Sequence, residues 1–510
     1  MRRFEHAGRY WEVELLGPTV QMKWGALDGP PQTFSRTFAT DGDAEVFAER
    51  QILAQRERGY VELARLAEVG AIEVVVERHR RFESVNRFIE ITQEDTKVTV
   101  RGGRIVEGRD VPDREQLHVQ HFANANAATA GYEARCAAAQ IEGARPTEAE
   151  LVHAHHTSAE LEAECEAAPT WVEPWAIYAD WLGAHGDARG EIAALQRAGR
   201  SSDAKRVLGA HLRELCGTDS GKLAFEYRHG FAVACTITVE PDGDDLLEDV
   251  MRAVLASPMG RFLEALRFGL AGQGDDNDWG PTIHTVADSR RGPHVRALRF
   301  DHYDHEDSEL SWTPFGDFSA SWEKLPALEH LHIKSGAGGT LGALRLPQLR
   351  TFIRESGGLG AGELDAIIGA TWPALEHLEI WFGSSHYGAE VELSSLRPIF
   401  AGTGLPALRH LGIVNCELVE IIIPELARSA ILPRLVSLDL SKGVLASRGA
   451  ALLVQHARAF AHLQTLDLSA SYLTEDELAL VRGALPNMVA GVQRERAGDD
   501  DTNRFVAVGE

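Results

Sequence analysis

Cysteine is scarce in this sequence, and long hydrophobic runs are missing. The 510 residues include 5 scattered cysteines with no CxxC pair, which excludes a disulfide framework and disfavours a zinc or redox motif. No apolar stretch approaches the roughly 18 residues of a membrane helix, and the run Ile421–Ile423 stops at Pro424. The segment Met1–His6 leads into alternating, strand-like residues and not into a signal-peptide core. These features predict a cytoplasmic protein without membrane contact.

Positive charge is also in short supply. The chain has 51 Lys and Arg residues against 76 Asp and Glu residues, a net charge of -25. Such a surface repels phosphate backbones at long range, so binding of nucleic acid by the whole protein is disfavoured. Hydrophobic residues make up 44% and charged residues 25% of the chain, as in ordinary globular proteins. The length predicts several domains.

The signature motifs of common enzymes are absent too. There is no P-loop, no dinucleotide-binding GxGxxG between a strand and a helix, no GxSxG, no HExxH and no kinase motif set. The glycine-rich stretch at 335–342 lacks the P-loop lysine. We therefore predict no catalytic residue, no cofactor, no metal and no small-molecule substrate.

Residues 1–67 combine strand-like and helix-like patterns. Strands are predicted at 9–15, 20–25 and 33–38, and a helix begins at Asp41. This order, with Trp24-Gly25 in the second strand, resembles the WGR domain, an α+β domain that touches DNA and a neighbouring domain in poly(ADP-ribose) polymerases. Ala26 stands where the family has arginine and cannot supply a guanidinium fork. Lys23 and Trp24 remain candidate nucleic-acid contacts.

Residues 72–146 repeat the same order of strands followed by a helix, at about 125–139. They resemble a second, degenerate WGR-like copy that keeps Arg104 but has Gly102 in place of the tryptophan. Arg101 and Arg104 belong to an arginine-rich stretch, which is either an anion or nucleic-acid patch or a solvated face. Acidic residues interleave with the arginines throughout, which favours the solvated face.

Residues 150–200 predict a small helical domain, whose first helix begins just after Thr147. The stretch 178–196, with its Tyr-Ala-Asp-Trp-Leu and His-Gly-Asp segments, resembles the repeat-companion domain found beside repeat arrays in myxobacteria and planctomycetes. Its polar residues could be a catalytic or metal cluster, or they could cap helices and pair across a turn. The structural interpretation is favoured, with Asp187 as a helix cap and Asp180 paired with Arg189.

Residues 205–490 contain a repeated strand unit. Apolar residues recur at equivalent positions, namely Leu266, Leu298, Leu331, Phe352, Leu378, Leu411, Leu438 and Leu466. Helical segments such as 447–459 and 474–482 separate the strands. The pattern resembles leucine-rich repeats, in which neighbouring units stack to share one core. The implied fold is an α/β horseshoe solenoid with a cap at its start, followed by a tail at 491–510 that either pairs with an edge or stays loose.

The outward side chains of these strands form candidate binding rows, because side chains alternate along a strand. The candidate partner-binding residues on this concave face are His330, His332, Lys334, Glu355, His377, Glu379, Trp381, His410, Asp439 and Asp467. The histidines could in principle bind metal or respond to pH. Thr351 separates His330 from His377, so no metal site is predicted. The acidic segment 301–307 is predicted to be a solvated loop.

The first hypothesis is a non-catalytic interaction scaffold or adaptor that binds a protein partner through the concave repeat face. The combination of segments resembles modular bacterial regulatory or conflict-system proteins, which implies an effector as partner. The alternative is a nucleic-acid-responsive regulator acting through Lys23, Trp24, Arg101 and Arg104. A third hypothesis is an enzyme with an unrecognised site. Overall, the predicted fold class is α/β, with two α+β WGR-like domains, a helical domain and the solenoid.

Overall fold

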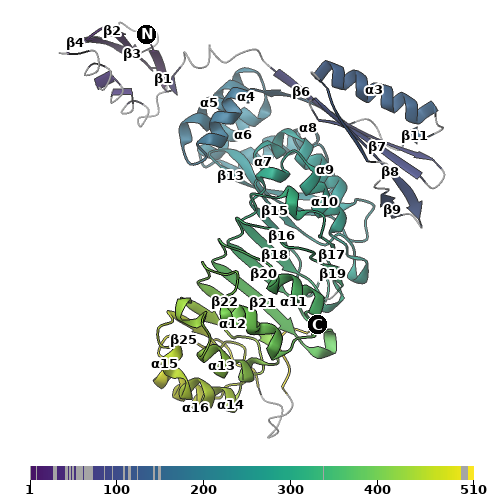
Figure 1. Cartoon of the computed structure of the whole chain (residues 1–510). Coiled ribbons are helices and arrows are strands. Elements are labelled where there is room, and N and C mark those ends of the chain that lie inside the picture. The colour runs from purple at the N-terminus through teal and green to yellow at the C-terminus, as the bar shows by residue number, and fades with distance from the viewer. Residues whose placement is uncertain are drawn as a thin grey trace. The chain divides into compact units, whose positions relative to one another are not determined.

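The structure is a computed structural model that describes most of the chain after residue 150 and shorter stretches before it (Figure 1). The described residues are 2–6, 9–26, 32–38, 40, 44, 47–48, 51–52, 55, 61–62, 73–84, 87–94, 96–106, 109–112, 117–122, 125–141, 144–146, 151–336, 338–495 and 504–509. One compact unit comprises 1–217, 227–231 and 256–262, and the other comprises the remaining residues. Among the residues that the structure describes, no helix is long and apolar enough to cross a bilayer.

A small antiparallel sheet forms from the first residues. Its strand order is β4-β3-β2-β1-β5, with β1 (Arg2–His6), β2 (Arg9–Leu16), β3 (Thr19–Ala26), β4 (Gln32–Thr37) and β5 (Val61–Glu62). Trp11, Val13 and Val20 pack against helical residues Ala44 and Ala48. The strands agree with the sequence pattern, because apolar residues alternate on the face that meets the helix.

A second antiparallel sheet follows. It consists of β6 (Glu73–Ser84), β7 (Arg87–Glu94), β8 (Lys97–Val106), β9 (Arg109–Pro112), β10 (His118–His121), β11 (Arg145–Pro146) and β12 (Leu151–Thr157), together with helix α3 (Ala125–Ile141). Phe82, Ile91 and Val98 pack against Ala128 and Tyr132 of α3. The predicted helix after Thr147 is wrong for 151–157, since β12 pairs antiparallel with β6. The next helix starts only after Ser158, which caps it.

Short helices then form the region predicted to be helical. They are α4 (Ala159–Ala167), α5 (Val172–Ala184), α6 (Ala188–Arg197), α7 (Ser201–Ala210) and α8 (Leu212–Cys216). Trp175 and Tyr178 of α5 pack against the rings of Phe231 and Phe262. This aromatic cluster is buried and gives the helices a core that they could not build alone.

The second unit contains a long sheet whose strands lie side by side in one ladder (Figure 1). Its order is β13 (Lys222–Arg228), β14 (Phe231–Thr238), β15 (Ala265–Phe268), β16 (Ala297–Phe300), β18 (His330–Lys334), β20 (Thr351–Glu355), β21 (His377–Gly383), β22 (His410–Cys416), β23 (Ser437–Asp439), β24 (Thr465–Asp467) and β25 (Met488–Val489). From β14 onward, neighbouring strands are parallel. Many of the connections between neighbouring parallel strands include helices, such as α11 (Ala361–Ile368), α13 (Val419–Ala427), α14 (Ser447–Gln455) and α16 (Glu475–Ala484).

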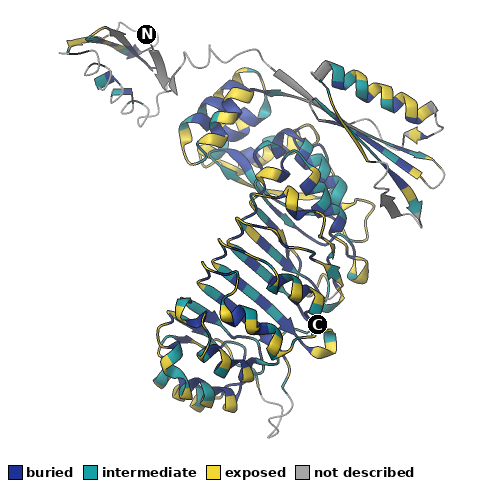
Figure 2. Cartoon of the chain, viewed as in Figure 1, coloured by how far each residue is buried: buried dark blue, intermediate teal, exposed yellow. Residues whose placement is uncertain are grey.

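The strand register is the one that the repeat pattern predicts. Leu298 pairs with Leu331, Leu331 with Phe352, and the series continues to Leu466. These side chains are buried, and the residues between them are more exposed, which Figure 2 shows as alternating bands along the strands. Burying one such side chain stabilises the fold by about 1.5–3 kcal/mol. The repeated leucines therefore form one continuous core.

A charged residue interrupts this core. Arg354 occupies an inward position of β20, between Ile333 and Ile380 of the neighbouring strands, and its side chain is 0% exposed. Its guanidinium donates to the Glu363 carboxylate at 2.7 Å and to the backbone carbonyls of Ser335, Gly336 and Glu355. A buried charge is tolerated when each of its nitrogens is hydrogen-bonded in this way.

The segment 504–509 lies against the end of β22 and the loops that follow β23 and β24. The Asn415 side chain donates to the Val508 carbonyl at 2.5 Å and accepts from the Val508 N–H at 2.9 Å. The Ala507 N–H donates to the Lys442 carbonyl, and Phe505 exchanges hydrogen bonds with the Tyr472 hydroxyl. The described part of the tail therefore follows neither alternative, because it neither pairs with a sheet edge nor stays loose but packs on the repeats.

We predict that Arg354→Ala lowers the free energy of unfolding by about 3–5 kcal/mol, because it leaves Glu363 charged, buried and without its cation. Urea unfolding followed by circular dichroism measures the change. The matched control is Arg350→Ala, since Arg350 pairs with Glu376 in an exposed position of the same region. The control should cost less than about 1 kcal/mol. Equal costs for the two variants would refute this interpretation of Arg354.

Candidate functional site: the outward face of the repeat strands

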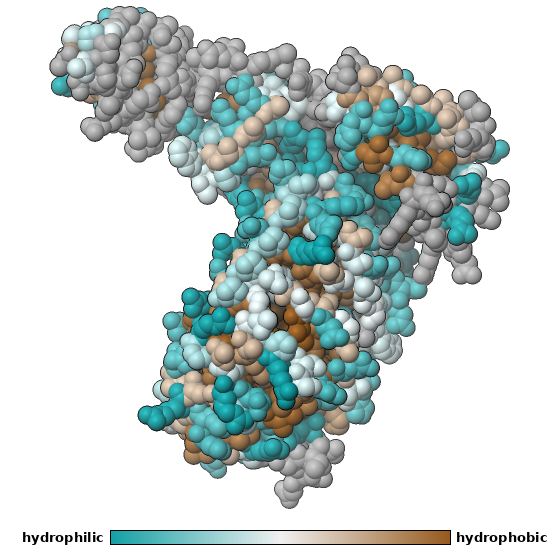
Figure 3. Space-filling model, in the orientation of Figure 1, coloured by the Kyte–Doolittle hydropathy of each residue, from teal (hydrophilic) through white to brown (hydrophobic). Residues whose placement is uncertain are grey.

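The outward side chains form continuous rows across the sheet. In one row His330 pairs with Thr351, then His377 with His410. In the next row His332 and Glu379 are separated by Ile353. The third row places Lys334 beside Glu355. Hydrophilic and hydrophobic residues are intermixed over the repeats in the view of Figure 3.

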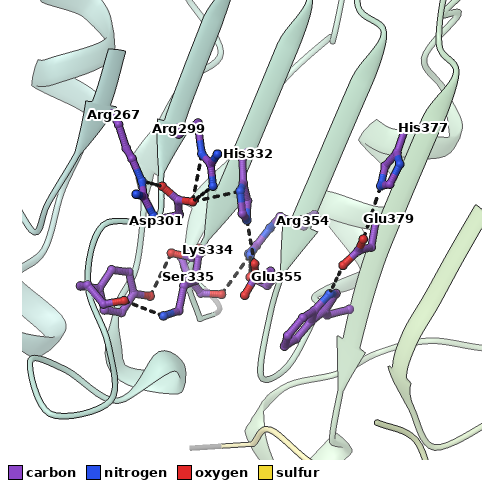
Figure 4. Close-up of polar contacts among 12 residues, drawn as sticks. Arg267, Arg299, Asp301, His332, Lys334, Ser335, Arg354, Glu355, His377 and Glu379 are labelled. Carbon is purple, nitrogen blue, oxygen red and sulfur yellow. Dashed lines mark hydrogen bonds and ion pairs between the residues drawn. The ribbon is translucent and has the colours of Figure 1, made fainter. Parts of the chain in front are cut away.

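The first polar cluster centres on Asp301, just after β16 (Figure 4). Arg267 donates to one of its oxygens at 2.6 Å, and Arg299 donates to the other at 2.5 Å. His332 Nδ1 lies 3.1 Å from Asp301, and His332 Nε2 lies 2.8 Å from Glu355. Both ring nitrogens therefore face carboxylates, an arrangement that favours the doubly protonated, cationic imidazole.

The charges in this cluster stabilise one another. Burial alone would raise the pKa of Asp301, but hydrogen bonds from His332, Arg267 and Arg299 outweigh burial and lower it. Burial would lower the pKa of His332, but Asp301 and Glu355 raise it. The prediction of a solvated loop at 301–307 is wrong for Asp301, which is buried, although Asp304 and Glu306 are exposed. The repeat spacing contains a signal for this cluster, because it places Arg267 and Arg299 in one row with His332.

Lys334 is held in place beside this cluster. Its ammonium donates to the Tyr303 carbonyl at 2.7 Å and lies 4.3 Å from the centre of the Tyr303 ring. The Tyr303 hydroxyl in turn donates to the Lys334 carbonyl at 2.9 Å. The lysine is thus oriented by the fold and half-buried.

A second polar cluster lies on β21 and β22. The rings of His377 and His410 are stacked, with centroids 3.9 Å apart and planes 13° apart. His377 Nε2 lies 3.4 Å from one Glu379 oxygen, and Trp381 Nε1 donates to the other oxygen at 2.7 Å. Figure 4 shows the pair His377 and Glu379.

Neighbours on the next strands complete this second cluster. His410 Nδ1 lies 2.7 Å from the Ser437 hydroxyl, and Lys442 lies 4.9 Å from the centre of the Trp381 ring. Burial and the neighbouring His377 lower the pKa of His410 to about 4, partly offset by Glu379, so His410 is neutral at pH 7. Burial would raise the pKa of Glu379, but hydrogen bonds from His377 and Trp381 lower it.

Acidic residues continue the row beyond Glu379. Gly412 pairs with Glu379 on one side and with Asp439 on the other, and Asp439 pairs with Asp467. A Cβ at Gly412 would lie 2.7 Å from Glu379 Cγ, so only glycine leaves this carboxylate room to lie across the strand. Burial, with the charges of Asp467 and Glu379 adding to it, raises the pKa of Asp439 despite a hydrogen bond from Ser441. This end of the face therefore favours cations.

The candidate nucleic-acid residues belong to two different sheets. Lys23 is exposed on β3, and Trp24 Nε1 donates to the Gln32 side chain at 2.8 Å. On β8, Arg104 is exposed, whereas Arg101 lies 3.5 Å from the buried Glu90 carboxylate. Arg81 also contacts Glu90, so an acidic partner is built into the arginine-rich stretch.

The polar residues of the helical region have structural roles. Asp187 caps α6 by accepting from the Arg189 N–H and also binds the buried Arg189 guanidinium at 2.8 Å. The predicted pair of Asp180 with Arg189 is wrong, because Asp180 contacts Arg197 at 3.6 Å. Arg189 instead pairs with Asp187, the carboxylate two residues before it in the chain.

The strand register and the recurring leucines define a leucine-rich-repeat array. No protein-family description and no curated protein matches the chain. A solved structure from Bacteroides fragilis is 21% identical and covers 84% of this chain and 99% of its own, with a TM-score of 0.49. An internalin of Listeria monocytogenes is 15% identical and covers 51% of this chain and 61% of its own, with a TM-score of 0.27. A leucine-rich-repeat protein of Leptospira interrogans is 14% identical and covers 48% of this chain and 69% of its own, with a TM-score of 0.21.

The cluster around Asp301 gives a pH prediction. The pKa of His332 is raised on folding, so its contribution to stability is complete below the unfolded value of about 6.5 and is lost as the pH rises through the folded pKa. The stability difference between the wild-type chain and His332→Gln should therefore shrink with rising pH. Urea titrations at a series of pH values measure it, with His330→Gln, exposed on the same strand, as control. A difference independent of pH would contradict a cationic His332.

Proposed function

We propose that this protein is a non-catalytic interaction scaffold or adaptor whose repeat strands bind a protein partner through their outward face. The observation that carries the proposal is a row of outward polar side chains held in fixed positions by their neighbours. Side chains that are already ordered lose little entropy on binding, which favours recognition of a partner. Extended repeat faces are suited to such contacts.

The two clusters differ in charge, and this difference indicates how a partner is recognised. Around Asp301 the face presents Arg267 and Arg299, whereas beyond Glu379 it presents Asp439 and Asp467. The half-buried Trp381 lies between these regions along the strand order, and partly buried tryptophans are frequent anchors in interfaces. A partner with complementary charges on either side of an apolar pocket fits this face best.

The partner that this arrangement supports is a protein, with an effector of a bacterial regulatory or conflict system as the specific proposal. The proposal of an effector as partner is supported by the resemblance of the N-terminal segments to WGR-like and repeat-companion domains. A cytoplasmic location remains a prediction from the sequence.

We predict that Trp381→Ala combined with Asp439→Lys and Asp467→Lys weakens partner binding by more than about 30-fold, because it removes the anchor and reverses the acidic end of the face. Affinity capture from the native lysate, after nuclease treatment, identifies the partner with the wild-type chain. Titration of the purified partner then gives the affinity of each variant.

The matched control changes the net charge of the chain by the same amount, but its substitutions lie on the helices of the repeats. It combines Asp365→Lys and Glu425→Lys with Leu480→Ala, all at exposed positions of α11, α13 and α16. This control should bind the partner as the wild-type chain does. Equal binding by both triple variants would refute the outward strand face as the interface.

The nucleic-acid alternative gives a separate prediction. Arg104→Glu should leave partner capture unchanged, because Arg104 lies on β8, outside the repeat array, and its neighbour Arg101 already contacts Glu90. Fluorescence anisotropy with labelled DNA and RNA at increasing salt measures the alternative directly. Binding that falls steeply with salt and is lost in Arg104→Glu would favour the nucleic-acid function.

A further inference from the structure

We infer that His377, Glu379 and His410 form a binding site for a divalent transition-metal ion on the outward face of the repeat strands. Each offers one ligand atom, and the three atoms lie within 4.8 Å of one another. In the part of the chain that the structure describes, this is the one group of three or more such side chains with that spacing. The site does not depend on the proposed partner, since all three residues belong to one chain.

The position of the two histidines follows from the strand register. The sequence pattern predicts no metal site, because Thr351 separates His330 from His377 in the row. The register instead makes His377 and His410 direct neighbours on β21 and β22. Adjacent parallel strands lie about 4.8 Å apart, which is within the span of two ligands on one ion.

The distance between His377 and Glu379 suits two ligands of one metal ion better than it suits a direct hydrogen bond. His377 Nε2 and the Glu379 oxygen are 3.4 Å apart, which is long for a hydrogen bond of this kind. Two ligands of a tetrahedral zinc ion, each about 2.1 Å from the metal, lie roughly 3.4 Å apart. The separation of these two atoms therefore already matches that of two ligands on one ion.

Two of the three ligands, Glu379 and His410, each have a second contact that orients the side chain. Trp381 Nε1 holds the remaining oxygen of Glu379, and Ser437 contacts Nδ1 of His410. Nε2 of His410 is buried and has no hydrogen-bond partner. Such outer contacts are typical of metal-binding histidines and carboxylates, because they fix the ring and leave the other nitrogen to the metal.

The ligand set indicates the kind of ion. Two imidazoles and one carboxylate suit zinc and other first-row transition metals, whereas magnesium and calcium prefer oxygen ligands alone. The stacked rings must turn about χ2 to point both lone pairs at one ion, because parallel rings cannot share a metal in their planes.

His332 provides a contrast within the same face. Both of its nitrogens contact carboxylates, Asp301 on one side and Glu355 on the other. A cationic imidazole has no lone pair for a metal. Histidine content alone therefore does not make a site here, and the free nitrogen of His410 is the distinguishing feature.

The test is titration of the purified full chain, dialysed against chelator, with zinc by calorimetry and with cobalt by visible absorption. We expect one equivalent of zinc to bind and the cobalt spectrum to show ligand-field bands of a protein-bound ion. His410→Ala and Glu379→Gln should each weaken binding by at least about 10–100-fold. His330→Ala, an exposed histidine two strands from His377 in the same row, should bind as the wild-type chain does.

Two milder variants keep the test decisive if a ligand variant fails to fold. Ser437→Ala should weaken zinc binding by about 10-fold or more through loss of ring orientation. Gly412→Ala should also weaken it, since the new Cβ would displace Glu379. If the wild-type chain binds no zinc, or if His330→Ala reduces binding as much as His410→Ala does, the inference is overturned.

Discussion

The in-register pairing of parallel strands is the constraint on which the rest of the structure depends. A single strand with its returning helix exposes its apolar side, so each repeat is stable only against a neighbour. The register aligns Leu331 with Phe352 and Leu378 and so builds a core, and it equally aligns the outward residues into rows. The polar clusters are a consequence of this alignment, because from β15 to β24 residues 21–33 apart in the chain become neighbours at every step.

Two outward clusters on one face use opposite electrostatic solutions. Around Asp301, opposite charges are close enough to fix His332 as a cation. Around His410, burial and the neighbouring His377 lower the pKa and keep the imidazole neutral, and Glu379 offsets only part of this effect. The same residue type in adjacent rows thus differs in charge because of which residues the register places beside it. The charge of a histidine on this surface therefore depends on the neighbours that the repeats place beside it and not on solvent exposure alone.

The sequence was sufficient for most of the fold and for part of the site. The recurring leucines predict the strands and even the pairing of His377 with His410, because both follow from one periodicity. Arg354 and Asp301 could not be predicted in the same way: each is polar at a position whose burial depends on partners from other repeats. The strand at 151–157 was missed because its edge pairing with β6 overrides the helix-favouring residues around it.

The segment at 504–509 has a consequence for how the repeats unfold. Its hydrogen bonds reach Asn415 at the end of β22 and Lys442 and Tyr472 in the loops after β23 and β24. In a simple array each repeat touches only its neighbours, so the last repeats can fray in succession. Here a single strip of backbone ties three consecutive repeats together. Opening any one of them breaks bonds to the strip, so the C-terminal repeats should melt as one cooperative block.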